Sequence, residues 1–179
     1  MKQKEKIIFK KLESNNLILN EFTVKHINKR YISWLNDQET VKFSRQKFFK
    51  HSRSSCLNYY KSFIKDGNIL LAIILKDKNL HIGNIGITID FRNMIADIAI
   101  IIGEKKNRSR GLGGEAWNLV IKSLIQSPFL KKITAGTVKS NKPMIKLMQN
   151  SKMTFDGSRK KHFLMGKNYE DLVYYAIYI

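Results

Sequence analysis

Three successive β-type runs between residues 68 and 103 constrain the fold of this chain more than any other feature of its sequence. The runs 68–76, 81–90 and 95–103 are rich in isoleucine, leucine and alanine, and short polar stretches separate them. Aliphatic and β-branched runs of this length are typical of strands. Polar connections as short as "KDKN" and "FRNM" join antiparallel neighbours. The sequence therefore predicts a three-stranded antiparallel meander.

The segments on either side of the meander switch between helical and strand-like hydrophobic periods. Because a helix at 111–127 separates the run 95–103 from a further strand at 131–138, we expect these two strands to be parallel. The other predicted strands are 16–22, 152–167 and 169–179, and the other predicted helices are 23–37, 52–66 and 142–152. This order predicts an α/β (α+β) fold with a single mixed central sheet of about seven strands, flanked by about four helices.

The length of the chain, 179 residues with 43% apolar residues, favours one domain over residues 1–179 with a core at about 15–179. The lone Cys56 excludes an internal disulfide and suits a reducing compartment. It is expected to be a small buried hydrophobe rather than a nucleophile. The basic N-terminus holds only "IIF" as an apolar run, and no run approaches the ~20 residues of a membrane span. We therefore expect a cytoplasmic protein with no leader, no membrane segment and no metal.

The charge of the chain is strongly positive, with 33 Lys and Arg against 14 Asp and Glu, a net charge of +19. Such a field favours acidic partners, including RNA, an anionic membrane or a phosphorylated small molecule. A bias of composition toward Lys, Asn and Ile is the other explanation, because the lysines are spread along the whole chain. The sequence leaves both explanations open.

A glycine-rich loop, "RSRGLGGEAW" at 108–117, stands before the predicted helix 111–127. A structural turn with close helix packing is one interpretation. A Walker A loop is excluded, because "EA" follows the last glycine where Lys and Ser or Thr are required. The spacing also satisfies the dinucleotide pattern G-x-G-x-x-A. That pattern normally carries an acidic residue about 20 positions on, where this chain has "LKK".

The series Arg108-x-x-Gly111-x-Gly113 resembles Q/R-x-x-G-x-G/A, the pyrophosphate loop of the GNAT acetyltransferases. The predicted order of strands and helices also resembles that family. The segments "IIIGEKKNRSRGLGGEAW" and "GKNYEDLVYYAIYI" are similar to its ribosomal-protein-alanine acetyltransferase branch. The resemblance implies an acetyl-CoA-dependent N-acetyltransferase in which an amine attacks the thioester directly, in a ternary complex.

The same resemblance implies where coenzyme A binds. Backbone N–H groups of the loop would surround the pyrophosphate at a helix N-terminus. The strand end at 101–103 would pair with the pantetheine arm, beside a predicted opening between the strands 95–103 and 131–138. The expected cofactor residues are Ile101, Ile102, Gly103, Arg108, Ser109, Arg110, Gly111, Leu112, Gly113, Gly114 and Asn141.

Asp97 is the candidate catalytic base, because it lies on the strand that resembles the acid-bearing segment of the branch. The general acid departs from the family pattern. Met148 stands where the family has tyrosine, and Met144 stands where the branch has serine. Water, Tyr169 or Tyr174 would have to return the proton.

The acceptor amine remains open in the sequence. A small amine on an anionic carrier, such as an amino-sugar nucleotide, suits the basic and aromatic stretch 44–55, in which Arg45, Phe48 and Arg53 are the candidate substrate residues. A protein N-terminus, as in the ribosomal-protein branch, is the alternative. A basic RNA-binding module is the non-enzyme alternative, although no RNA-binding motif is present. Exposed strand edges of such a fold suggest a homodimer.

Overall fold

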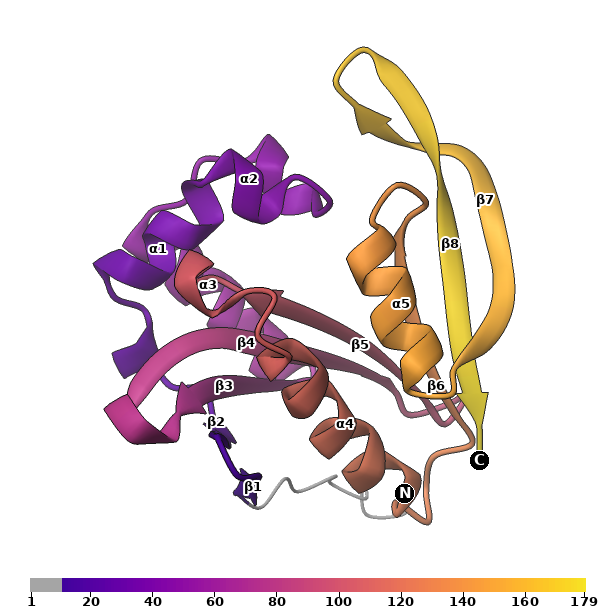
Figure 1. Cartoon of the computed structure of the whole chain (residues 1–179), viewed down its shortest axis with the longest axis horizontal. Coiled ribbons are helices and arrows are strands. Elements are labelled where there is room, and N and C mark those ends of the chain that lie inside the picture. Colours follow the sequence, from indigo (N-terminus) through magenta and orange to yellow (C-terminus); the bar gives the residue numbers. More distant parts are fainter. Residues whose placement is uncertain (1–10) are drawn as a thin grey trace.

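The computed structural model describes residues 11–179, and the basic stretch 1–10 lies outside the described residues. The described chain forms one mixed sheet of eight strands in the order β1-β2-β3-β4-β5-β6-β8-β7 (Figure 1). The strands are β1 (Leu12–Glu13), β2 (Leu17–Glu21), β3 (Ile69–Leu75), β4 (Leu80–Asp90), β5 (Ile95–Ile102), β6 (Lys132–Val138), β7 (Thr154–Met165) and β8 (Asn168–Tyr178). The helices are α1 (Lys29–Asn36), α2 (Gln38–Val41), α3 (Arg53–Lys65), α4 (Leu112–Ile125) and α5 (Lys142–Asn150), with 3-10 turns η1 (Val24–His26), η2 (Arg45–Phe48), η3 (Lys76–Lys78) and η4 (Lys105–Asn107).

The predicted meander is confirmed, because β3, β4 and β5 pair as antiparallel neighbours. The parallel pairing of β5 with β6 is confirmed as well. The sheet has one strand more than expected, the short β1.

The predicted helix 23–37 is correct only for its second half, because residues 24–26 form the turn η1 and the α-helix α1 covers residues 29–36. Asn28 begins α1 by accepting a hydrogen bond from the N–H of Tyr31. Asp37 then ends α1 and begins α2 by accepting from the N–H of Thr40. Side chains that cap a helix start compete with its continuation, so the apolar period of this segment spans more than one element.

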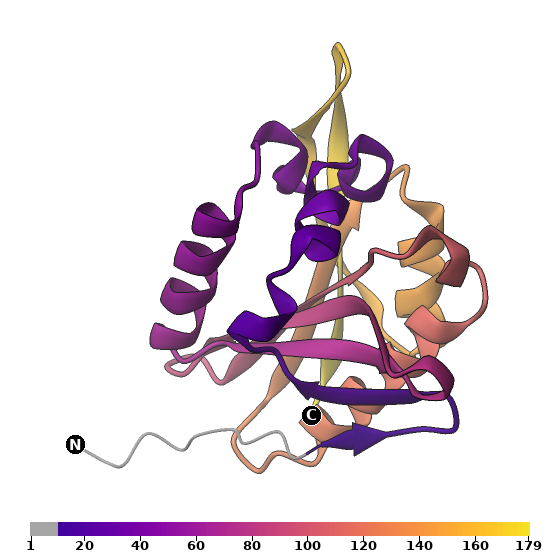
Figure 2. The same ribbon diagram turned by 90° about the vertical axis from the view of Figure 1, so that its left-hand side faces the viewer.

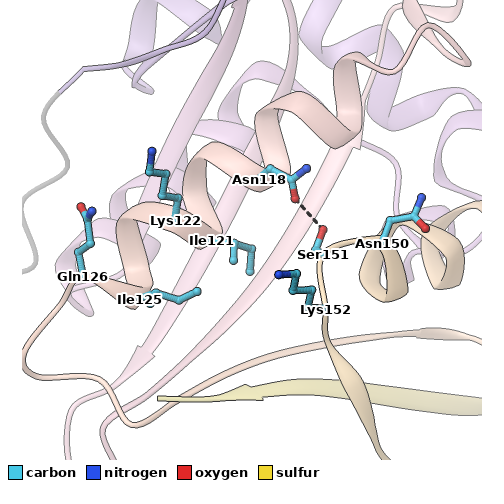
Figure 3. A pocket seen from close by; sticks show the side chains of 8 residues that line it. All are labelled: Asn118, Ile121, Lys122, Ile125, Gln126, Asn150, Ser151 and Lys152. Atoms are coloured by element: carbon cyan, nitrogen blue, oxygen red, sulfur yellow. Dashed lines mark hydrogen bonds between the residues drawn. The ribbon is translucent and has the colours of Figure 1, made fainter.

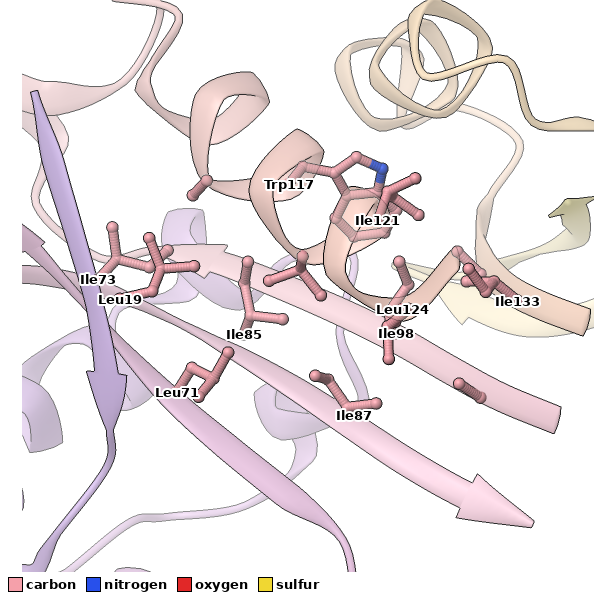
Figure 4. Close-up of a cluster of buried hydrophobic side chains, with 14 of the residues drawn as sticks. Leu19, Leu71, Ile73, Ile85, Ile87, Ile98, Trp117, Ile121, Leu124 and Ile133 are labelled. Atoms are coloured by element: carbon pink, nitrogen blue, oxygen red, sulfur yellow. The ribbon is translucent and has the colours of Figure 1, made fainter. Parts of the chain in front are cut away.

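Helices lie on both sides of the sheet, as the turned view shows (Figure 2), and each side holds a hydrophobic core. The larger core packs α4 against β2 to β6, with the fully buried Trp117 at its centre (Figure 4). The smaller core packs α1, α2 and α3 against β3, around Phe22 and Trp34. One face of the sheet is therefore covered from β2 to β6, whereas the helices on the other face cover β3 and leave parts of β4, β5 and β6 exposed.

The β5–β6 pairing ends early and leaves an opening between the strands. Only Ile95 to Asp97 pair with Lys132 to Thr134, although β5 continues to Ile102 and β6 to Val138. Beyond this point each strand follows its other neighbour, β4 or β8. The predicted opening between these two strands is therefore present.

Candidate active site

The glycine loop enters α4 through a left-handed turn. Gly111 is the N-cap residue with φ 77°, and Ser109 has φ 59°. L-residues avoid this region because the Cβ atom crowds the following carbonyl group. A glycine at position 111 therefore allows the loop to begin the helix without backbone strain.

Six successive N–H groups of this loop have no hydrogen-bond acceptor within residues 11–179. They belong to Ser109, Arg110, Gly111, Leu112, Gly113 and Gly114. A Cβ atom built on Gly111 or Gly114 meets nothing within 4 Å, so the space beside these groups is open. Unpaired N–H groups at a helix N-terminus form an anion site, and phosphate is a common ligand.

The backbone of β5 alternates in direction along the opening. The N–H of Gly103 donates to the carbonyl of Ile82 at 2.9 Å, and the register with β4 continues unbroken along β5. Hydrogen-bonded pairs alternate in an antiparallel ladder, so the polar groups of Ile101 point toward β4. The groups that point toward β6 and the opening are those of Ile98, Ile100 and Ile102.

Arg108 occupies a different position from the one expected of a phosphate ligand. Its Nε donates to the carbonyl of Ile102 at 2.9 Å, and its Nη2 donates to the carbonyl of Gly103 at 3.0 Å and to the hydroxyl of Thr40 at 2.5 Å. The backbone N–H of Arg108 donates to Lys105. The guanidinium therefore fastens the end of β5 to α2, and the free N–H groups begin one residue later.

Gly103 lies against the indole ring of Trp34. A Cβ atom at this position would stand 1.9 Å from Cδ2 of the ring, and the indole N–H donates to the carboxylate of Glu104 at 3.2 Å. Gly103 therefore permits the contact between β5 and α1, which the sequence did not indicate.

Asp97 lies where β5 and β6 separate. Its Oδ2 accepts a hydrogen bond of 2.7 Å from the hydroxyl of Thr134, the last residue of β6 that pairs with β5. Within residues 11–179 it forms no ion pair, despite the excess of cations. Crowding by neighbouring atoms removes water and raises the pKa of the Asp97 carboxyl group, and the Thr134 hydroxyl opposes this rise. The residue still has exposed surface, so a substrate or water can reach it.

Small side chains extend the exposed surface around Asp97, which we call the open face. It consists of Thr88, Asp97, Ala99, Thr134 and Gly136, all on the same side of β4, β5 and β6. Tyr174 of β8 borders it, because its ring lies 2.8 Å from the place where a Cβ of Gly136 would stand. Within the described chain its hydroxyl group forms no hydrogen bond.

The other candidate for the general acid lies elsewhere. Tyr169 is 63% exposed at the start of β8, near the tip of the β7–β8 hairpin. Met148 is fully buried in the larger core, and Met144 packs against that core. Their side chains have no proton to exchange, so the helix α5 supplies no acid at these positions.

Asn141 caps the start of α5. Its Oδ1 accepts from the N–H of Met144 at 3.4 Å, and its Nδ2 donates to the hydroxyl of Thr137 at 2.9 Å. It follows β6 at the open end of the β5–β6 opening. One amide hydrogen remains for a ligand.

The predicted acceptor residues are split between two elements. Arg45 and Phe48 belong to η2, and exposed Arg53 begins α3. The ring of Phe48 lies 6.0 Å from that of Phe163 in β7, and Lys47 donates to the carbonyl of Leu164 at 2.6 Å. The turn η2 therefore contacts the β7–β8 hairpin across the side of the molecule that carries the open face.

A separate hollow of about 340 Å³ lies between the C-terminal parts of α4 and α5 (Figure 3). Asn118 and Ser151 face each other across it, and the Ser151 hydroxyl donates to the Asn118 amide oxygen at 2.8 Å. Its lining contains no carboxylate that could take a proton from an amine. We therefore place the candidate active site at the glycine loop, the β5–β6 opening and the open face, and not in this hollow.

Three further expectations concern the cysteine, a metal site and a membrane segment. Cys56 is buried in the smaller core, and burial raises the pKa of its thiol, so it is no activated nucleophile. No cluster of three His, Cys, Asp or Glu side chains that could hold a metal ion occurs within residues 11–179. None of the helices described here has both the length and the apolar character to span a membrane.

Sequence reasoning missed the N–H group of Ile100, the hydrogen bond of Thr134 to Asp97 and the lining by Gly136. Backbone direction depends on the register between β4 and β5, and the place where β5 and β6 separate depends on tertiary packing. The one available signal was the strict alternation from Asp97 to Ala99, which places both on the same face.

Comparisons with known proteins agree with this geometry. The family model described as an acetyltransferase (GNAT) domain matches residues 16–154. A comparison with curated proteins finds no significant match.

Solved structures with the same fold include acetyltransferases named for different substrates. The ribosomal-protein alpha-N-acetyltransferase RimL in complex with coenzyme A aligns with TM-score 0.84 and 13% identity, over 95% of this chain and 98% of that one. Spermidine N-acetyltransferase from Vibrio cholerae, in complex with CoA and spermine, aligns with TM-score 0.81 and 15% identity, over 92% and 96%. The microcin C7 self-immunity acetyltransferase MccE, in complex with acetyl-CoA and AMP, aligns with TM-score 0.79 and 18% identity, over 93% and 94%. At these identities the likeness shows the fold alone.

Proposed function

Because the chain belongs to the GNAT acetyltransferases, we propose that it transfers an acetyl group from acetyl-CoA to a primary amine, by direct attack within a ternary complex. The observation that carries this proposal is the row of six unpaired N–H groups at the start of α4, beside the opening between β5 and β6. Acetyl-CoA supplies the acetyl group as an activated thioester.

The residues around the opening fit the parts of this substrate. The N–H groups of Ser109 to Gly114 bind the pyrophosphate, in the open space beside Gly111 and Gly114. The N–H of Ile102 hydrogen-bonds the pantetheine arm, while its carbonyl already accepts from Arg108. Asn141 offers its free amide hydrogen from the other side of the opening.

A backbone N–H group of β5 polarises the thioester carbonyl. The polar groups of Asp97 point toward β4, so its pair with Thr134 in the parallel ladder uses the N–H of Ile98. The first N–H group of β5 that points into the opening is therefore that of Ile100. A fixed donor aimed at a developing oxyanion lowers the barrier without reorganising, and we assign this role to the Ile100 N–H group.

Asp97 takes the proton that the attacking amine must lose. The raised pKa of its carboxyl group makes it a better base than an ordinary aspartate. Thr134 fixes the carboxylate through its 2.7 Å hydrogen bond. The exposed surface of Asp97 allows transfer through one water molecule.

Tyr174 returns a proton to the leaving thiolate. Its ring covers Gly136 beside the opening, and its hydroxyl is free within the described chain. It replaces the acid that Met148 cannot supply from α5.

The acceptor is a small amine on an anionic carrier, such as an amino-sugar nucleotide. The +19 charge supports this choice, since it attracts phosphates and repels polyamines. Arg45, Phe48 and Arg53 are the residues proposed to hold the carrier, from η2 and the start of α3. The AMP bound to MccE is a precedent for a nucleotide in this fold.

A protein N-terminus is the second candidate, favoured by the structural likeness to RimL. A basic peptide would need an acidic surface, and Asp97 is the only carboxylate of the open face. The contact of Lys47 with the β7–β8 hairpin also limits access for a folded protein.

Isothermal titration tests the coenzyme site first. We expect acetyl-CoA to bind in the micromolar range and NAD not to bind. Gly114→Val should raise the acetyl-CoA dissociation constant by about tenfold or more, because a side chain at this position projects into the open space beside the free N–H groups. The melting temperature is the control, since a Cβ here meets nothing within 4 Å. Unchanged acetyl-CoA binding by the folded variant would remove the loop from the proposal.

A thiol-release assay then decides between acceptors. We expect turnover with a UDP-linked amino sugar to exceed turnover with the free amino sugar, spermidine and a basic peptide. Preference for the peptide would favour the second candidate. Release of no thiol with any amine, together with salt-sensitive binding of RNA, would favour the non-enzyme alternative.

The pH dependence of kcat/KM tests Asp97. A base acts only when deprotonated, so activity should fall as pH decreases through the raised pKa of Asp97, above the ordinary value of 3.8. Asp97→Asn should lower kcat by about 100-fold and remove this acid limb, with acetyl-CoA binding unchanged. Full activity of Asp97→Asn would exclude Asp97 as the base. Tyr174→Phe should lower kcat and leave the acid limb in place.

A further inference from the structure

We propose that Arg159 binds the anionic group of the acceptor, at the border of the open face. This inference rests on the proposed function and names the side chain that selects an anionic acceptor. It concerns β7, from which the sequence suggested no site residue.

Tyr174 connects Arg159 to the border of the open face. The Cζ of Arg159 lies 5.5 Å from the centroid of the Tyr174 ring, and that ring covers Gly136. Gly136 is two residues along β6 from Thr134, a spacing of about 7 Å. Thr134 in turn holds Asp97. The guanidinium thus lies beyond Tyr174 and Thr134 as seen from the proposed base, on the side of the sheet that carries the open face. A carrier group attached to the amine would extend in this direction.

The charge of Arg159 is not satisfied by the protein. Within residues 11–179 it forms neither an ion pair nor a hydrogen bond, and its residue is exposed. The nearby carboxylate Asp171 is already engaged, since it accepts from the N–H of Lys161 at 2.9 Å and lies 3.9 Å from Lys139. The positive charge is therefore available to a ligand.

The strand itself is irregular at this point. The β7–β8 register breaks between Arg159 and Phe163, and Lys161 has φ 47°. This break leaves Lys160, Lys161 and His162 out of the ladder as an exposed bulge, and the two lysines place further cations beside Arg159. Bulges commonly redirect side chains next to functional sites.

The chemistry suits a phosphate group. A guanidinium presents two parallel N–H donors to phosphate oxygens, and stacking on an aromatic ring limits the loss of side-chain entropy on binding. A cation at this border would repel a polyamine. Arg159 thereby favours an amine attached to a phosphate over a cationic amine of the same size.

Calorimetric titration with UDP tests this assignment, using protein saturated with coenzyme A so that the glycine loop is occupied. Arg159→Gln should raise the UDP dissociation constant by about tenfold or more, the effect of losing a charge-assisted hydrogen bond. Arg92→Gln, the same change in the β4–β5 turn, should leave it unchanged. Equal UDP affinity of wild type and Arg159→Gln, or no binding of UDP to the wild type, would overturn the proposal.

The transfer assay separates this result from the proposed function. Arg159→Gln should raise KM for the UDP-linked amino sugar and leave kcat/KM for the free amino sugar unchanged, and Arg159→Lys should restore part of the difference. Arg159→Glu should shift the preference toward spermidine. Binding of UDP through Arg159 without acetyl transfer would reject the proposed acceptor chemistry and keep the anion site. An equal loss with both sugars would indicate a structural role for Arg159 and reject the inference.

Discussion

At the scale of single residues, position 103 has no room for a side chain larger than that of glycine. The ring of Trp34 occupies the space of a Cβ atom, so Gly103→Ala should force the ring or the end of β5 to move. Overpacking of this kind costs roughly 1–3 kcal/mol of unfolding free energy. Urea denaturation measures the loss.

Gly114→Ala is the matched control for that change. Its Cβ would meet nothing within 4 Å, and it lies inside α4. Alanine favours a helix over glycine by up to about 1 kcal/mol, so this variant should be at least as stable as the wild type. Equal stability of Gly103→Ala and wild type would contradict the packing described for Trp34.

His81 gives the second prediction at this scale. It is 6% exposed among Phe22, His26, Tyr31 and Trp34, and its Nε2 pairs with Asn84 Oδ1 at 3.0 Å. Burial, followed by the charge of His26 and, to a smaller degree, that of Arg30, lowers the pKa of His81 from 6.5 to about 4. Between pH 6.5 and about 4, His81 is protonated in the unfolded chain and neutral in the folded chain. The free energy of unfolding therefore falls as pH decreases through this window.

The expected loss is about 3 kcal/mol between pH 6.5 and 4. His81→Gln retains a polar partner for Asn84 and should flatten the pH dependence of the unfolding free energy. His162→Gln, at an exposed position in β7, is the control. The measurement is urea denaturation at pH 7 and pH 4.5. Parallel curves for His81→Gln and wild type would exclude His81 as the source.

At the scale of elements, α5 ends with lysine where a glycine is expected. The N–H of Lys152 donates to the Gln149 carbonyl and that of Met153 to the Met148 carbonyl, and Lys152 has φ 62°. This is the hydrogen-bond pattern of a Schellman motif, which favours glycine at the left-handed position. Lys152→Gly should therefore raise the unfolding free energy by about 1 kcal/mol.

The opposite sign is expected at Lys122, an exposed position inside α4. Lys122→Gly should cost about 1 kcal/mol, because glycine disfavours a helix interior. Thermal unfolding of both variants tests the pair. A loss of stability in Lys152→Gly would mean that its side chain makes a contact worth more than the strain.

Elements were predictable where one strong period filled one element. The meander, α4 and the parallel β6 follow from runs that a turn or a glycine loop bounds on each side. The segment 23–37 was not predictable in this way, since Asn28 and Asp37 each restart the chain as a new helix. In the candidate site, too, residues that are consecutive in the sequence were predictable, and contacts between separate strands were not. The loop from Ser109 to Gly114 lies in consecutive sequence, whereas the Arg159–Tyr174 contact depends on how β7 pairs with β8.

At the scale of the whole molecule, the net charge of +19 has a kinetic consequence. Long-range attraction of an anionic acceptor is screened by salt, with a Debye length of about 10 Å at 0.1 M and about 3 Å at 1 M. We expect kcat/KM for a UDP-linked amino sugar to fall steeply with added NaCl, and that for the free amino sugar to change little.

The same titration decides between the two explanations of the charge. A flat salt profile for the anionic acceptor would assign the lysines to compositional bias. A difference between the two acceptors would assign part of the charge to substrate capture.

The early end of the β5–β6 ladder links the stability of the molecule to metabolism. Three residue pairs join the two halves of the sheet at this seam, and an extended ligand arm that hydrogen-bonds along β5 would act as a missing strand. A ligand that binds only the folded state adds RT ln(1 + [L]/Kd) to its stability, about 2.7 kcal/mol at 100 times Kd. On this view the coenzyme is a removable structural part. The lifetime of the folded enzyme in the cell would then rise and fall with the supply of acetyl-CoA.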